Sequence, residues 1–198
     1  MAIKLASIFF TMILVDNYVL AKFLGICPFL GVSKKLDSAV GMSLAVTFVM
    51  VMATAATWPL YMGILAPNGL EYLQTIVFIL VIAILVQLLE NFLKKFIPAL
   101  YKSLGVYLPL ITTNCTILGV TILNLDNGYS FPESIVCDAG AGIGFLVAMV
   151  LFSGVRRKVE QAIVPECFKG LPITLVAAAM TSLSFMGFGG IVEAIFGV

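Results

Sequence analysis

The sequence contains no histidine and is poor in charge. Only 11% of its 198 residues are Asp, Glu, Lys or Arg, whereas a soluble globular domain carries about 25%. The absence of histidine excludes histidine metal sites, histidine general bases and Ser-His-Asp chemistry. The net charge of +1 offers no broad basic surface, so no nucleic-acid partner is expected.

The chain is instead rich in apolar residues. Hydrophobic residues make up 62% of it, against about 45–50% in soluble proteins. This composition is typical of an integral membrane protein in the lipid bilayer and leaves little room for a soluble domain. A cleaved signal peptide is not expected, because Asp16 and Asn17 interrupt the first apolar run and no small-x-small cleavage site follows directly.

Largely charge-free stretches mark six candidate membrane spans, since a spanning helix needs roughly 20 apolar residues. They are residues 5–33, 38–70, 72–89, 103–125, 139–155 (extending back toward Ser134) and 170–192. The first is too long for one straight crossing. Its roughly 29 residues would extend about 43 Å as a continuous helix, against a hydrocarbon core of about 30 Å. It must therefore tilt, break or re-enter.

The basic residues predict the orientation. Nine of the eleven lie in alternate loops, namely Lys34, Lys35, Lys94, Lys95, Lys102, Arg156, Arg157, Lys158 and Lys169. On the opposite side the only basic residue is Lys4. Because basic loops stay in the cytoplasm, both termini are expected to be extracytoplasmic.

One short phrase occurs twice, and each copy begins with a cysteine. Residues 27–32 read Cys-Pro-Phe-Leu-Gly-Val, and residues 115–120 read Cys-Thr-Ile-Leu-Gly-Val. Three spans separate the copies, so the two phrases run antiparallel across the membrane. Inverted repeats of this kind place their functional site near the bilayer midplane, within broken helices.

The predicted fold is an all-α integral membrane protein with six transmembrane helices arranged as two inverted three-helix repeats. A single polytopic domain covers residues 1–198, with one repeat at about 1–93 and the other at about 94–198. The closely spaced residues Gly140, Gly142 and Gly144 are expected to permit close helix packing.

The first and fourth helices are expected to be broken near mid-membrane. Gly25 and Pro28 flank Cys27, while Pro109 and a Thr-Thr-Asn run precede Cys115. Proline removes a backbone donor and clashes with the preceding turn. Such breaks are tolerated at membrane depth only where the backbone is buried in protein or lines a cavity.

The two repeated thiols are candidate metal ligands. Buried cysteine is often only a small apolar residue, but Cys27 and Cys115 occupy equivalent repeat positions beside helix breaks. Thiolates bind Cu(I), zinc and iron–sulfur clusters, and a [2Fe–2S] centre commonly takes four cysteines. Cys137 and Cys167 fall near opposite ends of the fifth span and are interpreted as structural. The chain then offers two ligands, so a second subunit must supply the others.

Two further polar residues are candidates. Asp16 lies within the first span, where ionisable groups mark ion or proton paths, although it could also pair with Lys22 and be structural. Asn114 adjoins Cys115 and could donate hydrogen bonds that tune a cluster.

Several longer phrases resemble the A subunits of the Rnf electron-transport complexes. They are residues 22–35, 108–115, 154–157 and 185–188. The resemblance covers nearly the whole chain. It implies a complex of the prokaryotic inner membrane that moves electrons between reduced ferredoxin and NAD and couples this to Na⁺ or H⁺ transport.

The resemblance also implies partners and a cofactor. In these complexes the A subunit pairs with its inverted paralogue, the E subunit, around an intramembrane [2Fe–2S] cluster to which each gives two cysteines, here Cys27 and Cys115. The other partners would be the flavin-carrying D and G subunits and the cytoplasmic B and C subunits. This chain would serve an oxidoreductase complex without catalysing a reaction alone.

Two alternatives remain open from the sequence. The inverted repeats with broken helices also fit a small secondary transporter. A purely structural membrane subunit, with its cysteines as core residues, is the other. A transporter does not require matched cysteines at the midplane, so the repeated phrase favours the electron-transport subunit.

Overall fold

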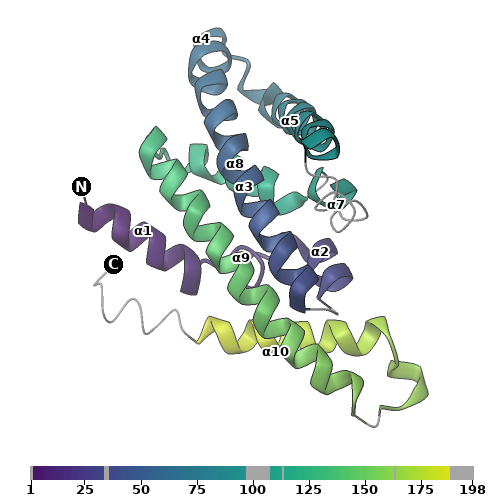
Figure 1. Ribbon diagram of the computed structural model, residues 1–198. Helices are drawn as coiled ribbons and strands as arrows, with labels where there is room; N and C mark the ends of the chain where they lie inside the picture. The colour runs from purple at the N-terminus through teal and green to yellow at the C-terminus, as the bar shows by residue number, and fades with distance from the viewer. Residues whose placement is uncertain (1, 34–35, 97–107, 113, 163, 188–198) are drawn as a thin grey trace.

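The computed structural model describes residues 2–33, 36–96, 108–112, 114–162 and 164–187. Every regular element in these ranges is helical (Figure 1). In chain order they are α1 (Ala2–Leu14), α2 (Ile26–Val32), α3 (Leu36–Leu60), η1 (Tyr61–Leu65), α4 (Ala66–Asn68), η2 (Glu71–Leu73), α5 (Gln74–Phe96), α7 (Leu108–Thr112), α8 (Cys115–Asp126), α9 (Phe131–Glu160), η3 (Glu166–Phe168) and α10 (Leu171–Met186).

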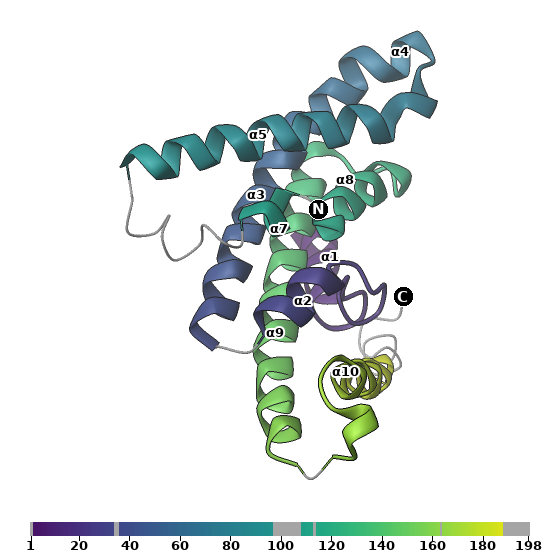
Figure 2. The same ribbon diagram turned by 90° about the vertical axis from the view of Figure 1, so that its right-hand side faces the viewer.

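The centre of the molecule is the pair of long helices α3 and α9, which lie side by side in both views (Figures 1 and 2). Glycine allows the helices to approach closely, because Thr47 of α3 fills the space where Gly142 of α9 would carry a Cβ. On another side of α9, the α1 carbonyls of Phe9 and Met12 lie 3.1 and 3.0 Å from the Cβ positions of Gly140 and Gly144. The close packing predicted for these glycines is confirmed.

Three helical segments are long and apolar enough to cross a membrane within the described part of the chain. They are Leu36–Asn68, Gln74–Phe92 and Phe131–Glu160. Shorter apolar helices cover Lys4–Leu14 and Leu171–Met186, and the fourth predicted span contains the apolar helices α7 and α8. Each predicted span thus contains an apolar helix, and residues 103–107 and 188–192 of two spans lie outside the described ranges.

Two of the predicted spans are interrupted. In the first, α1 ends at Leu14 and α2 begins at Ile26. In the fourth, α7 ends at Thr112 and α8 begins at Cys115. The expected helix breaks are therefore present. The arrangement as two inverted repeats of three membrane crossings stays a prediction.

The fifth span starts earlier than predicted. Its helix, α9, begins at Phe131 behind a capping box in which Ser130 and Glu133 satisfy each other's backbone amides. Counting charges placed the start between Ser134 and Ala139, because Asp138 looked like a boundary. The structure instead places Asp138 inside the helix and fully buried.

Helices α5 and α10 lie at the periphery. Figure 2 shows α5 extending away from the central pair, while Figure 1 shows α10 lying across the lower part of α9. The apolar side chains of α5 are largely exposed in the isolated chain, as at Ile76, Ile79, Leu80, Ile84, Leu88 and Phe92. Such a surface suits lipid or a partner protein rather than water.

Candidate functional site

The segment just before the first cysteine phrase contacts the start of the second. Cys27 is the second residue of α2, and Cys115 is the first residue of α8. The Gly25 backbone N–H donates a hydrogen bond to Cys115 Sγ over 2.9 Å. Both thiols are exposed on the isolated chain. The structure thus places Cys115 against the residue that caps the helix carrying Cys27, and a shared site for the two thiols stays a prediction.

Gly25 permits this approach because it has no side chain. Its backbone is left-handed, with φ 81° and ψ 28°, a conformation that other residues adopt only at a cost. A Cβ here would collide with Thr116 Oγ1 and stand 3.3 Å from Asn114 Oδ1. The backbone of the first break therefore lies directly on the start of α8.

A second close contact extends the same packing along α8. At Gly119, the glycine of the repeated phrase, a Cβ would stand only 2.6 Å from Leu24 Cδ1. Gly31, its counterpart in the first copy, has no atom within 4 Å of its Cβ position. The repeated glycine is thus used for close packing in only one copy.

The segment between α1 and α2 is not helical, and hydrogen bonds to distant elements satisfy its polar groups. Asn17 Nδ2 donates to the Gly144 carbonyl of α9 over 2.8 Å, and Asn17 Oδ1 accepts from the Val19 amide over 3.1 Å. Ser182 of α10 donates to the Leu20 carbonyl. These bonds replace the helical ones, which makes an irregular backbone tolerable inside an apolar protein.

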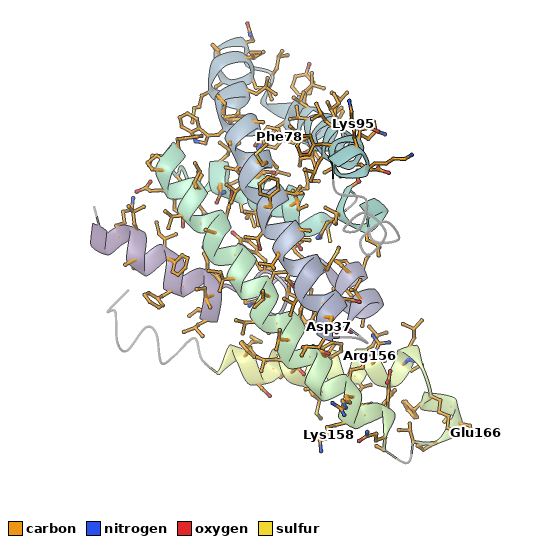
Figure 3. All side chains as sticks on the ribbon, in the orientation of Figure 1. Asp37, Phe78, Lys95, Arg156, Lys158 and Glu166 are labelled. Carbon is orange, nitrogen blue, oxygen red and sulfur yellow. The ribbon has the colours of Figure 1, made fainter. Side chains whose placement is uncertain are left out.

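Helix α9 also holds α2 in place. The rings of Phe29 and Phe152 stack with centroids 4.1 Å apart. The Arg156 guanidinium donates to the Leu30 carbonyl and, over 2.8 Å, to Ser33 Oγ. A cation at the end of a helix bonds carbonyls that lack helical partners. Figure 3 labels Arg156 on the lower half of α9.

Asn114 has two roles at the start of α8. Its Oδ1 accepts from the Thr116 amide over 3.0 Å and so caps the helix. Its Nδ2 is buried and has no hydrogen-bond partner within the described ranges, and the same holds for Thr116 Oγ1. Buried donors are rarely left unpaired. A donor without a described partner therefore lies on the residue before Cys115, and its bonding to a cluster stays a prediction.

The chemistry of the site is that of two soft ligands near backbone donors. The amide end of α8, at Cys115, favours negative charge, and the Gly25 amide already bonds the sulfur. Within the described residues, no group of three or more Cys, Asp or Glu side chains could hold a metal ion. Cys27 and Cys115 as ligands of a shared metal centre stay a prediction.

The remaining cysteines lie elsewhere, as predicted. Cys137 is fully buried in α9, with its sulfur 4.0 Å from the Tyr18 hydroxyl. Cys167 is exposed in η3, beyond the far end of α9. Neither contacts the pair formed by Cys27 and Cys115 in any described bond.

Asp16 has a partner within its own segment. Its carboxylate lies 4.0 Å from Lys22 Nζ, and both side chains are partly exposed, at 44% and 34%. The Lys22 ammonium also stands 4.9 Å from the centre of the Tyr18 ring. This geometry matches the structural alternative for Asp16. Its place in an ion path stays a prediction.

Sequence reasoning missed two residues that position the site. From the sequence, Arg156 is a topology signal alone, and Ser182 is not singled out. The sequence around Arg156 and around Ser182 contains no signal for their long-range hydrogen bonds to residues 20–33. Only the fold reveals that both support the Cys27 side of the site.

Comparison with known proteins identifies relatives along nearly the whole chain. The model of the Rnf-Nqr family, described as Rnf-Nqr subunit, membrane protein, matches residues 5–192. The A subunit of an ion-translocating oxidoreductase complex from Syntrophotalea carbinolica is 54% identical over 91% of this chain and 93% of its own.

Two other relatives are also A subunits of ion-translocating oxidoreductase complexes. The A subunit of a Na⁺-translocating ferredoxin:NAD⁺ oxidoreductase complex from Acetobacterium woodii is 53% identical over 94% of this chain and 97% of its own. The A subunit of an ion-translocating oxidoreductase complex from Aliivibrio salmonicida is 51% identical over 91% of this chain and 94% of its own. With its apolar helices and these relatives, the chain is a membrane protein and belongs to the Rnf-Nqr family.

Proposed function

We propose that this chain is a membrane subunit of an ion-translocating ferredoxin:NAD⁺ oxidoreductase complex. In this complex, Cys27 and Cys115 would give two of the four ligands of a [2Fe–2S] cluster shared with a related subunit. The observation that carries the proposal is the hydrogen bond from the Gly25 amide, two residues before Cys27, to the Cys115 sulfur. The names of the relatives support the kind of complex.

The residues of the chain suit this cofactor. Both sulfurs are exposed on the isolated chain, where ligands from a second subunit could join them. Gly25 holds the backbone of one phrase against the other and donates to Cys115 Sγ. Asn114 Nδ2 is free to donate to a nearby sulfur, a bond of the kind that tunes cluster potentials. When bound, the cluster would supply a one-electron relay between carriers on the two sides of the membrane.

The number of thiols also predicts a partner. A [2Fe–2S] centre commonly takes four cysteines, and Cys137 and Cys167 stand apart from the site. A protein of the same fold and opposite orientation would present an equivalent pair. We infer that the E subunit of the complex is this partner, with the B, C, D and G subunits completing the assembly.

The proposal is tested on the whole complex, purified without oxygen. Iron, acid-labile sulfide and the visible and EPR spectra are measured for Cys27→Ser, Cys115→Ser and Cys167→Ser. The first two are expected to lose the signal of one [2Fe–2S] centre. Cys167→Ser is the matched control, because its thiol is also exposed but lies in η3.

The measurements distinguish cluster ligands from residues that do not bind the cluster. Full iron content and an unchanged EPR signal in both Cys27→Ser and Cys115→Ser would show that these residues are not ligands. Subunit composition, measured on the same preparations, distinguishes loss of the cluster from loss of assembly. Should a serine variant fail to assemble, Cys27→Ala and Cys115→Ala, which keep the small volume, are measured in the same way.

A further inference from the structure

Two buried side-chain oxygens beside Asp138 of α9 have no hydrogen-bond partner among the residues that the structure describes. They are Asn124 Oδ1 of α8 and Ser134 Oγ of α9. The exposed fractions of Asn124, Ser134 and Asp138 are 1%, 0% and 0%. Buried polar atoms are nearly always paired. Unpaired oxygens beside a buried carboxylate therefore indicate a position that binds a ligand.

Asp138 receives hydrogen bonds from two other helices. Asn124 Nδ2 of α8 donates to Asp138 Oδ1 over 2.7 Å. The Thr54 hydroxyl of α3 donates to the same carboxylate. Ser134 stands one helical turn before Asp138 on α9, and side chains four residues apart share a face of a helix. Asn124 Oδ1 and Ser134 Oγ are then the oxygens that remain without a partner among the described residues.

Thr54 and Ser134 differ from the other hydroxyl groups of these helices. Ser43, Thr47 and Thr57 of α3 each donate to the carbonyl four residues earlier, at 2.7 to 2.8 Å. This is the usual way in which a hydroxyl is satisfied inside an apolar helix. Thr54 donates instead to Asp138, and Ser134 Oγ has no partner within the described ranges. The lone pairs of both oxygens are thus available to a ligand.

Asp138 also has no cationic partner among the described residues. The ion pairs of the described residues involve Glu133, Asp16, Glu160 and Glu166, and none includes Asp138. A buried carboxylate without a cation is strongly unfavourable. A proton on the carboxyl group would neutralise it but could bond only one of the two unpaired oxygens, Asn124 Oδ1 and Ser134 Oγ. A small hard cation binds carboxylate, amide and hydroxyl oxygens together.

We propose that Asp138, Asn124, Thr54 and Ser134 form a Na⁺-binding site inside this chain. One carboxylate matches the single charge of Na⁺, and three neutral oxygens complete the ligand set. The site is separate from the thiols, because Asn124 lies nine residues beyond Cys115, or about 13 Å along α8. Its use in ion transport rests on the proposed function, whereas Na⁺ binding itself does not.

The test measures bound ²²Na⁺ by equilibrium dialysis of the purified, oxidised complex without an electron donor. Asp138→Asn is expected to bind one Na⁺ fewer per complex than the wild type. Asp126→Asn is the matched control, because Asp126 is an exposed carboxylate at the end of α8, and it is expected to bind as the wild type does. Ser134→Ala removes one neutral ligand, and we expect its Kd to be about tenfold weaker, equivalent to about 1.4 kcal/mol.

Wild-type stoichiometry and Kd in Asp138→Asn would overturn the site, and would leave a buried water or a proton as the partner of these oxygens. If Asp138→Asn does not assemble, Na⁺ binding is measured in Ser134→Ala and Thr54→Val instead. An unchanged Kd in both variants would overturn the proposed Na⁺ site. Iron and labile sulfide are measured on the same samples. Wild-type iron with one Na⁺ lost supports the site whether or not Cys27 and Cys115 prove to be cluster ligands.

Discussion

The Gly25 amide donates to the Cys115 thiol over 2.9 Å, which links two chain segments from opposite halves of the sequence. The bond depends on a left-handed glycine pressed against the N-terminal cap of α8. The candidate site therefore depends on backbone geometry as much as on its two sulfur atoms.

Replacement of Gly25 by alanine tests this dependence. The left-handed backbone costs an ordinary residue about 1–2 kcal/mol, and the added Cβ would collide with Thr116 Oγ1. We expect Gly25→Ala to lose cluster iron and to lower the thermal unfolding midpoint of the complex. Gly31→Ala is the matched control, because nothing lies within 4 Å of its Cβ position. Equal iron content in the two variants would contradict the proposed role of Gly25.

Arg156 is expected to stabilise the Cys27 side of the site. Its guanidinium bonds the Leu30 carbonyl and Ser33 Oγ, and Ser33 is fully buried. Leaving such groups unpaired costs about 1–3 kcal/mol. Arg156→Gln should therefore lower the unfolding midpoint of the complex and reduce its iron content.

Arg157 is the control for this effect, because it is the neighbouring basic residue and is exposed. Both residues carry the same topology signal, so Arg157→Gln should change neither quantity. A similar loss in the two variants would show that positive charge at this loop matters, rather than the bonds made by Arg156.

The sequence predicts the helical class, the apolar segments and both helix breaks, because each is encoded locally. Charge-free runs mark the spans, and Gly25 and Asn114 mark the breaks. Pro28 lies in the first turn of α2 and does not interrupt it. The hypothesis that Cys27 and Cys115 act together comes from the repeated phrase alone. These features need no knowledge of which helices pack together.

Long-range contacts could not be predicted in this way. The bonds from Ser182 to Leu20 and from Arg156 to Leu30 join residues that are far apart in sequence and carry no pairing signal. Asp138 is the clearest error. A charged residue near a span boundary usually marks that boundary, but Asn124 from α8 makes a buried position possible.

Asn114 is expected to tune the electron carrier without being needed to hold it. Serine is as good a helix cap as asparagine, so Asn114→Ser keeps the cap while removing the free Nδ2 donor. Loss of a donor to sulfur makes reduction harder. We expect normal iron content and a more negative reduction potential in an EPR-monitored redox titration. The control is Asn127→Ser, at the opposite end of α8, which should leave the reduction potential unchanged. An unshifted potential in Asn114→Ser would show that Asn114 Nδ2 bonds no cluster atom.

Cys167 offers a direct test of orientation. Its side chain is exposed in η3, close to Arg157 and Lys158 in sequence, and these basic loops are predicted to be cytoplasmic. A membrane-impermeant maleimide should therefore label Cys167 in inverted membrane vesicles and not in right-side-out vesicles, as read by peptide mass spectrometry. Cys137 is the internal control, because it is fully buried and should stay unlabelled in both. Labelling of Cys167 only in right-side-out vesicles would reverse the predicted topology and would place both termini in the cytoplasm.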